Sequence, residues 1–457
     1  MSRTGTSELN APPSTPLSER LADQPIAYRR VGRIDLSQLI FEARELAERL
    51  PQHAYVINMH TDRYAYLLGF CAAVIAGQCT LMPPNRQPDT LADLQSSYPD
   101  SYFLEPNTYP LLESIPYRAS GTQHDGNDIP RVMNHQSCVI AFTSGSTGRP
   151  TPILKTWETL RGGILSDREA LIGDRDKPLS MLATVPSQHM WGFGTSVLLP
   201  LFAQVAISEL NPFYPKDISE ALSSLPEPRV LVSSPLHLRA LMKSRVALPK
   251  LECIFTATAP LTAADAVLME AHFQAPILDV FGCSESGIFA TRRTASEDLW
   301  TLTRPFELET RESGTFIRAP HLPAPVSLPD IVEQFGERQF RWLGRQQDMV
   351  NVAGKRGSLA DLNRRLLAIP GVEDGVIFKP ENAGERLAAL VVAPALSVSE
   401  IQRELRARME PVFVPRPLLL VTDLPRQETG KLPLAAVQAL FAELRAKRDC
   451  HSTGIET

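Results

Sequence analysis

Short apolar runs alternate with segments of helical periodicity along most of this 457-residue chain. Apolar residues recur at helical spacing over 36–50 and 64–76, and the run 55–59 between them has the pattern of a strand. Further strand patterns follow at 138–142, 181–185, 229–232, 253–256 and 277–281. This alternation predicts an α/β fold with a large N-terminal domain of helix-covered, mostly parallel sheets.

These apolar runs end in clusters of Pro, Ser, Thr or Gly. Ligands of open α/β sheets bind beyond the carboxyl ends of the strands, so we expect these clusters to share one crevice. The clearest cluster directly follows the strand candidate 138–142 and consists of Thr143, Ser144, Gly145, Ser146, Thr147 and Gly148.

This Ser/Thr/Gly loop has the composition of an anion-binding loop. Its two glycines lack Cβ atoms, so the backbone can aim successive N–H groups at one anion while the hydroxyls add donors. It is not a Walker A loop, because Arg149-Pro150 follows in place of Lys-Ser/Thr. We predict a phosphate-binding loop, with an ordinary turn as the alternative.

Four further segments resemble, in order, motifs of the adenylate-forming superfamily, as the loop itself does. They are Pro-Ser-Gln-His-Met-Trp-Gly at 186–192, Phe-Gly-Cys-Ser-Glu at 281–285, Asp330 followed by Gly344-Arg345 and the stretch 351–356, and the segment 424–431 that ends in Gly430-Lys431. Five ordered matches identify the chain much more strongly than any one of them alone.

The resemblance implies ATP and Mg²⁺ as cofactors. Joining a carboxylate to the α-phosphate of ATP brings two anions together, so such a site needs fixed positive poles. By resemblance, the loop backbone binds the β- and γ-phosphates, Glu285 is catalytic and holds Mg²⁺, and Lys431 is the mobile catalytic cation. Asp330 binds the ribose hydroxyls, and Arg345 binds the same sugar or a nearby phosphate.

Further site residues follow from the same resemblance. Gly282 and Ser284 belong to the nucleotide site, and Arg356 contacts phosphate in the second step. His189 is a catalytic candidate. The acyl pocket is formed by His189, Trp191, Phe193, Thr258, Ala259, Phe281 and Gly282.

The C-terminal part has a shorter pattern, which predicts a small mobile α+β domain. Helical spacing over 361–367 and 399–409 flanks strand patterns at 372–378 and 387–392. We predict a disordered N-terminus (1–20), an adenylate-forming N-terminal domain (21–344), a C-terminal lid domain carrying the catalytic lysine (345–445) and a disordered tail (446–457). Gln347 stands where many of the resembled enzymes have a hinge Asp.

Composition excludes several classes of protein. The net charge is −5, so the chain lacks the excess of basic residues that is typical of proteins that bind nucleic acids. We expect no membrane span and no secretory signal, and therefore a cytoplasmic protein, because no apolar run of about 18 residues occurs. Six cysteines without a C-x-x-C pair predict reduced core thiols.

The loop also departs from the superfamily pattern. Thr151 stands where relatives commonly have Lys, and the nearest lysine is in Lys155-Thr156-Trp157. This version resembles the short aryl- or acyl-carrier-protein ligases of aryl-polyene and xanthomonadin-type pathways. That resemblance implies an acid such as a hydroxybenzoate, delivered to the phosphopantetheine thiol of an acyl carrier protein, with free CoA as the alternative acceptor.

Two other classes of function stay open at this point. The segment 282–286 nearly matches the G-x-S-x-G nucleophile elbow of serine hydrolases. A catalytically silent nucleotide-binding scaffold would carry the same loop. For single residues, Glu285 could also lie in the first turn of a helix, and Trp191, Phe193 and Phe281 could be plain core aromatics.

Overall fold

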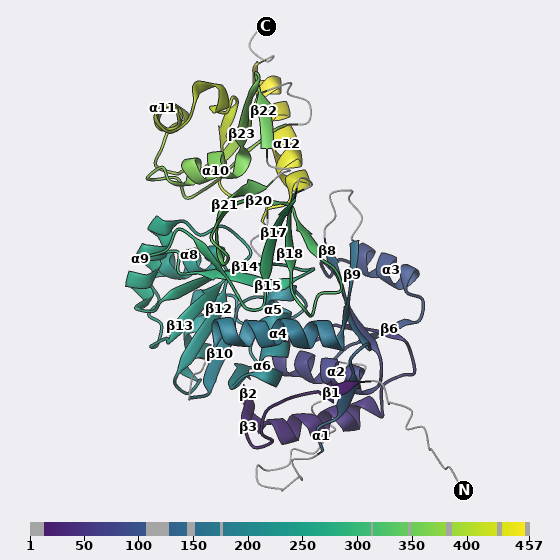
Figure 1. Cartoon of the computed structure of the whole chain (residues 1–457). Coiled ribbons are helices and arrows are strands. Elements are labelled where there is room, and N and C mark those ends of the chain that lie inside the picture. The colour runs from purple at the N-terminus through teal and green to yellow at the C-terminus, as the bar shows by residue number, and fades with distance from the viewer. Residues whose placement is uncertain are drawn as a thin grey trace, which may run out of the picture.

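The computed structural model describes residues 13–106, 128–143, 151–173, 177–311, 314–345, 349–380, 386–426 and 432–452. A large domain built on two main sheets is followed by a smaller C-terminal domain (Figure 1). The predicted fold class is confirmed. Loop residues 144–150, Gln347 and Lys431 lie outside the described ranges.

The first main sheet has five strands in the order β6-β4-β5-β8-β9. The first four strands are parallel, and the last, β9, runs antiparallel to β8. Their bounds are β4 Tyr55–Asn58, β5 Cys79–Met82, β6 Ser101–Leu104, β8 Ser137–Thr143 and β9 Thr151–Thr156. Helices α2 (Arg63–Ile75) and α3 (Pro88–Ser97) connect its first three strands.

The second main sheet has eleven strands in the order β20-β21-β16-β15-β14-β13-β12-β10-β11-β2-β3. It is parallel from β14 to β2 and antiparallel beyond. The strands are β2 Pro25–Arg29, β3 Gly32–Asp35, β10 Leu179–Ala183, β11 Val205–Ser208, β12 Arg229–Ser233, β13 Cys253–Thr256, β14 Ile277–Cys283, β15 Gly287–Arg292, β16 Trp300–Leu302, β20 Asp330–Phe335 and β21 Gln339–Arg345.

The antiparallel part follows from the connections. After β14 the strands are joined without helices, and short links can only join antiparallel neighbours. A small sheet of β17 (Glu307–Arg311), β18 (Gly314–Arg318) and β19 (Val326–Leu328) is inserted before β20.

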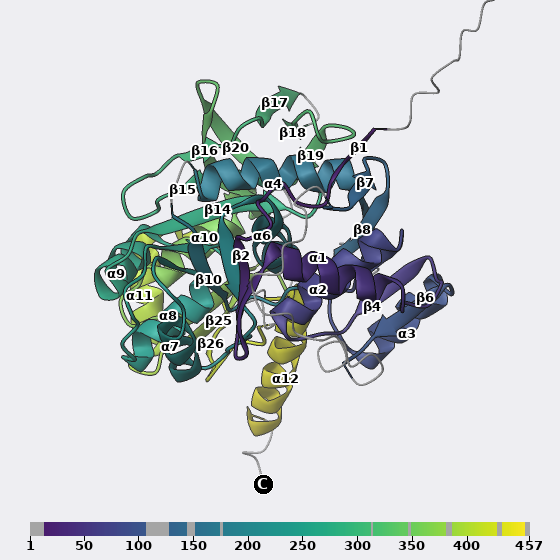
Figure 2. The same cartoon turned by 90° about the horizontal axis from the view of Figure 1, so that it is seen from below.

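Helices α1 (Leu36–Ala47) and α2 lie between the two main sheets (Figure 2). Each begins at an Asp whose side chain accepts a backbone N–H, Asp35 for α1 and Asp62 for α2. The other helices of the large domain are α4 Trp157–Leu171, α5 Met190–Phe193, the π-helical turn Gly194–Leu198, α6 Leu199–Phe202, α7 Pro215–Ser223, α8 Pro235–Ser244 and α9 Ala263–Phe273. One buried cluster contains residues of both main sheets, so the sheets share a core.

The C-terminal domain packs a three-stranded sheet against helices. Its order is β24-β25-β26, and α12 covers it through Phe441, whose ring stands edge-on to that of Phe378 with the ring centroids 5.2 Å apart. The elements are β22 Met349–Val352, β23 Lys355–Ser358, α10 Leu359–Leu367, β24 Asp374–Phe378, β25 Ala388–Val392, α11 Val398–Arg408, β26 Leu418–Leu420 and α12 Leu434–Ser452. In Figure 1 the first turn of α12 points toward the large domain.

Both predicted disordered ends are partly structured. Strand β1 (Ser14–Pro16) pairs with β7 (Arg131–Met133), and the buried Arg20 guanidinium donates to the carbonyls of Pro200 and Val205 at 2.7 and 2.8 Å. Helix α12 continues past residue 446 to Ser452. Polar composition suggested disorder, but strand pairing and an uninterrupted helical ladder order these residues.

No helix in the described ranges is both long and apolar enough to cross a lipid bilayer.

Candidate active site

The hairpin β8–β9 carries the predicted phosphate-binding loop. Buried apolar residues of β8 fix it in the sheet, and the pair Thr143–Thr151 is the last pair before the loop. The loop itself, from Ser144 to Gly148, lies outside the described residues. The structure therefore places the two ends of the loop at the carboxyl end of β8.

The segment with Glu285 forms the turn of a second hairpin, β14–β15. Gly282 passes so close to the returning chain that a Cβ there would lie 2.5 Å from the carbonyl oxygen of Gly287. Ser284 and Glu285 follow in the turn, and Glu285 is exposed. Because an antiparallel strand and not a helix follows, this is no nucleophile elbow, and Glu285 is not in the first turn of a helix.

A buried lysine joins the two hairpins. Lys155 on β9 is 4% exposed, and its ammonium donates to the backbone carbonyl of Glu285. Burial lowers the pKa of Lys155 to about 8, and the nearby Cys283 and Glu285 oppose this shift. The turn of β14–β15 therefore contacts β9 at Lys155, which pairs with Val139 near the start of β8, although the two hairpins belong to different sheets.

The segment 186–192 follows β10 and turns into α5. His189 is the N-cap of α5, where its Nδ1 accepts from the backbone N–H of Trp191 at 3.3 Å. The Trp191 indole donates to the Ser233 carbonyl at 3.3 Å, at the end of β12. Phe193 is fully buried and stands edge-on to Phe70 of α2 at 5.0 Å, which makes it part of the core.

The remaining pocket candidates lie on neighbouring strand ends. Thr258 and Ala259 follow β13, and Thr258 has φ +81°, a strained value for a β-branched residue. Phe281, at the end of the adjacent β14, contacts the ring of Trp300 at 5.1 Å and so extends an aromatic cluster of the antiparallel strands. The strands β10, β13 and β14 thus present their predicted residues at one edge of the sheet.

The backbones of Asp330 and Arg345 are register partners in the antiparallel pair β20–β21. Asp330 is buried, and one of its carboxylate oxygens accepts from the indole of Trp342 at 2.8 Å. Gly344 has φ +136°, and a Cβ there would lie 2.5 Å from Oγ of Ser358 at the start of the C-terminal domain. The junction between the domains is therefore closely packed at this glycine.

The C-terminal candidates lie apart from the strand ends in this arrangement. Arg356 is paired with Asn351 in the hairpin β22–β23, which Figure 1 shows at the top of the molecule beside α12, above the level of β8. Lys431 is outside the described residues. The segment leading to it is anchored, because both ends of the Arg426 guanidinium donate to the Asp374 carboxylate at 2.7 Å.

Two arginines, the buried Arg63 and the half-buried Arg86, support the site and were not singled out from the sequence. Arg63 is 1% exposed and donates to the carbonyls of Ala183 and Val185, both at 2.7 Å, at the end of β10. Arg86 donates to the carbonyl of Met59 and to Oε1 of Gln188, at 3.0 and 3.3 Å. An arginine at the start of an apolar helix or in a polar loop looks exposed in sequence, so only the fold reveals this role.

The described residues could supply only part of the ligands of a Mg²⁺ ion. Among them no group of three His, Cys, Asp or Glu side chains could enclose a metal ion. Mg²⁺ commonly uses one or two carboxylates together with substrate phosphates and water. A single exposed carboxylate such as Glu285 is compatible with that mode.

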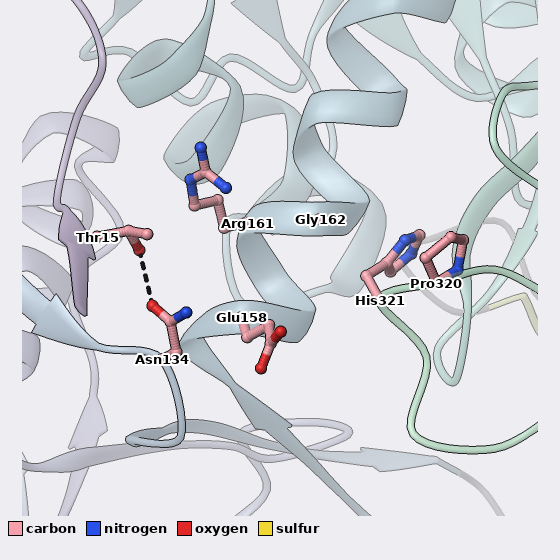
Figure 3. Close-up of a pocket in the computed structure, with 7 residues that line it drawn as sticks. All are labelled: Thr15, Asn134, Glu158, Arg161, Gly162, Pro320 and His321. Atoms are coloured by element: carbon pink, nitrogen blue, oxygen red, sulfur yellow. Dashed lines mark hydrogen bonds between the residues drawn. The ribbon is translucent and has the colours of Figure 1, made fainter. Parts of the chain in front are cut away.

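A separate hollow of about 210 Å³ lies around the first turns of α4 (Figure 3). It is lined by Thr15, Asn134, Glu158, Arg161, Gly162, Pro320 and His321. It includes none of the predicted site residues, and it is smaller than the roughly 300–1,000 Å³ of typical ligand pockets. We assign no role to it.

Comparison with known proteins identifies the family. The profile of the AMP-binding enzyme family matches residues 65–311, more than half of the chain and the part that contains both hairpins. The chain belongs to the AMP-binding enzymes. It is thus a member of the adenylate-forming superfamily that the five motifs resemble.

Individual relatives share part of the sequence. The chain is 29% identical to a 4-coumarate–CoA ligase of Rhodobacter capsulatus, over 62% of this chain and 72% of that one. It is 24% identical to a 3,4-dihydroxybenzoate–[aryl-carrier protein] ligase of Bacillus anthracis, over 66% of this chain and 73% of that one.

Solved structures share the fold at low sequence identity. An anthranilate CoA ligase in complex with anthranoyl-AMP has a TM-score of 0.77 at 16% identity, covering 93% of this chain and 96% of that one. ATP-bound MatB from Rhodopseudomonas palustris has a TM-score of 0.75 at 17% identity, covering 94% and 98%. The large sheet domain followed by a smaller C-terminal domain is common to these structures.

Proposed function

We propose that this AMP-binding enzyme converts a carboxylic acid and ATP to an acyl-AMP and pyrophosphate, and then transfers the acyl group to a phosphopantetheine thiol. The observation that carries the proposal is the meeting of the two hairpins. Lys155, on the strand that follows the loop, donates to the backbone carbonyl of Glu285, so the loop-bearing hairpin contacts the turn with Glu285. In this proposal, the hairpin that carries the phosphate-binding loop and the carboxylate for Mg²⁺ contribute to one site.

The chemistry follows from the charges. We assign the β- and γ-phosphates to the backbone of loop 144–148, and the ribose to Asp330 with Arg345. Mg²⁺ at Glu285 would neutralise phosphate charge as pyrophosphate leaves. Lys431, carried by the C-terminal domain, would stabilise the pentavalent phosphorus and the attacking carboxylate.

The second step needs a different arrangement of the C-terminal domain. We infer that Lys431 leaves and that the hairpin β22–β23, with Arg356, approaches for attack by the thiol. In the structure this hairpin lies away from β8. A rotation near residue 345 is required to bring it in.

We propose an aromatic acid as substrate and a carrier protein as acceptor. Both sequence relatives named above are ligases of aromatic acids, one for CoA and one for an aryl-carrier protein. The strand ends near His189, Trp191 and Phe281 offer apolar walls suited to a ring. Free CoA is the second candidate acceptor.

The test first measures ATP–pyrophosphate exchange with aryl, short-chain and long-chain acids. The acid with the highest exchange rate is then incubated with ATP and either CoA or holo carrier protein, and thioester formation is measured. We expect exchange with at least one aryl acid and faster thioester formation on the carrier protein. A chain that binds ATP but exchanges pyrophosphate with no acid would be a nucleotide-binding scaffold instead. Faster transfer to CoA would overturn the acceptor alone.

Lys431→Ala separates the two steps. It should lose most of the exchange activity, yet still convert supplied acyl-adenylate and thiol to thioester. Equal loss of both activities would contradict the proposed change of arrangement.

A further inference from the structure

An ion pair joins helix α8 of the large domain to the C-terminal domain. The Lys243 ammonium lies 2.5 Å from a carboxylate oxygen of Glu373, the residue that directly precedes β24. The two side chains are 57% and 45% exposed, so the pair lies at the surface. It is a second contact between the domains, in addition to the close packing of Gly344 against Ser358 at their junction.

Both ends of this ion pair belong to well-packed parts of their own domains. Lys243 lies in the last turn of α8, and Leu238 and Leu241 of the same helix are buried in the large domain. The backbone N–H of Glu373 donates to the Val392 carbonyl at 2.8 Å, which attaches Glu373 to β25. A movement of one domain relative to the other therefore changes the distance between the two charges.

The residue after Glu373 forms an ion pair within the C-terminal domain. The Asp374 carboxylate accepts two hydrogen bonds from the Arg426 guanidinium, both at 2.7 Å. The start of β24 therefore carries two adjacent acids, one paired with the large domain and the other with the segment at Arg426. That segment moves together with Glu373 when the C-terminal domain moves.

The proposed second step requires the C-terminal domain to rotate near residue 345. Such a rotation carries Glu373 with the C-terminal domain, while Lys243 stays with the large domain, so the two charges separate. We propose that the Lys243–Glu373 ion pair is a latch that stabilises the arrangement described here and has to break before thioester formation. This inference rests on the proposed function. Exposed ion pairs contribute little free energy, which suits a contact that breaks in every catalytic cycle.

Charge reversal tests the latch. The wild type, Lys243→Glu, Glu373→Lys and the variant with both changes are compared at low salt, using the acid with the fastest exchange. One assay measures pyrophosphate exchange, and the other measures thioester formation from supplied acyl-adenylate and saturating thiol. Because reversal turns attraction into repulsion, each single variant should raise the ratio of thioester formation to exchange by about 5-fold, the upper range for an exposed ion pair.

The variant with both changes restores a pair of opposite charges, so its ratio should return to that of the wild type. An unchanged ratio in the single variants would overturn the proposal, and so would a doubly changed variant that does not return to the wild-type ratio. High salt should remove the effect of the single changes, because exposed charges are screened. A ratio that does not depend on salt would also contradict the latch.

Lys216→Glu is the matched control. Lys216 is an exposed lysine whose partner, Glu220, lies on the same helix, α7. The variant makes the same change of charge as Lys243→Glu without altering the contact between the domains, so it should keep the wild-type ratio. If Lys216→Glu changed the ratio as much as Lys243→Glu does, net charge would explain the effect and the latch would be refuted.

A covalent link replaces the ion pair in a second experiment. Lys243→Cys and Glu373→Cys are combined, and the two thiols are joined by a bifunctional maleimide with a cleavable linker. The linked protein should keep pyrophosphate exchange, lose thioester formation and regain it when the linker is cleaved. Thioester formation by the linked protein, or loss of its exchange, would contradict the proposal. Wild type treated with the same reagent controls for the native cysteines.

These measurements distinguish failure of the latch from failure of the proposed function. A wild-type chain that exchanges pyrophosphate with no acid would refute the proposed function. Normal exchange and thioester formation in the wild type, with the same ratio in all charge variants, would refute only the latch.

Discussion

Replacing Gly192 with alanine should displace the acyl-site segment and reduce adenylation more than stability. The added Cβ would lie 2.0 Å from the carbonyl oxygen of Pro186. That oxygen accepts the backbone N–H of His189 at 3.1 Å. Because the obstacle is backbone, the segment 186–192 has to move as a unit.

The size of the effect follows from the distance. Restoring even a 3.0 Å contact needs a shift of about 1 Å (3.0 − 2.0), and misplacement by that amount can cost about 100-fold in rate. Overpacking of this kind typically costs about 1–3 kcal/mol of stability. We therefore expect a loss of about 100-fold in acid-dependent pyrophosphate exchange from a protein that still folds.

Gly194→Ala is the matched control. A Cβ at Gly194, two residues further along, meets only an oxygen of Asp167, at 3.9 Å. Gly194→Ala should keep wild-type exchange and melt at the wild-type temperature or slightly above it. The reasoning would be refuted if Gly192→Ala exchanged pyrophosphate within about 3-fold of the wild type, or if both alanine variants lost activity equally.

Three further perturbations address the supporting residues. Arg63→Met should lower the free energy of unfolding by about 3 kcal/mol in urea denaturation, since several buried carbonyls lose their donor; an unchanged midpoint would exclude this role. Arg426→Gln should reduce pyrophosphate exchange at nearly constant melting temperature, because the segment before Lys431 loses its bidentate ion pair with Asp374. Full exchange activity in this variant would show that the ion pair is dispensable. Burial raises the pKa of Asp279 from 3.8 to about 7, so its contribution to stability falls as pH rises through that window. Asp279→Asn should therefore gain melting temperature relative to the wild type between pH 5 and pH 8, and a constant difference would contradict the assignment.

The sequence predicted the elements that local pattern determines. Strands at 229–232 and 253–256 and the helices at 36–50 and 64–76 appear in the structure with small changes at their ends, because apolar periodicity and capping Asp residues act locally. The order of the motifs also pointed to the family, which the match over 65–311 confirms.

The pattern of apolar residues does not predict which distant segments pair with each other. Apolar runs look alike in parallel and antiparallel pairs, so the antiparallel half of the large sheet was not predicted. Burial of Lys155 and Arg63 depends on which segments meet in space, and a charged residue alone suggests exposure. For the same reason the Glu285 turn was compatible with a helix start until its strand partner was known.

Transfer of ¹⁸O from the acid to AMP tests the central claim most directly. If the carboxylate attacks the α-phosphate of ATP, one carboxylate oxygen becomes the bridge of the acyl-AMP and leaves with AMP when the thiol takes the acyl group. Using an acid labelled with ¹⁸O in its carboxylate, our account predicts AMP that carries one labelled oxygen, measured by mass spectrometry. Unlabelled AMP, or ADP and phosphate as products, would contradict it.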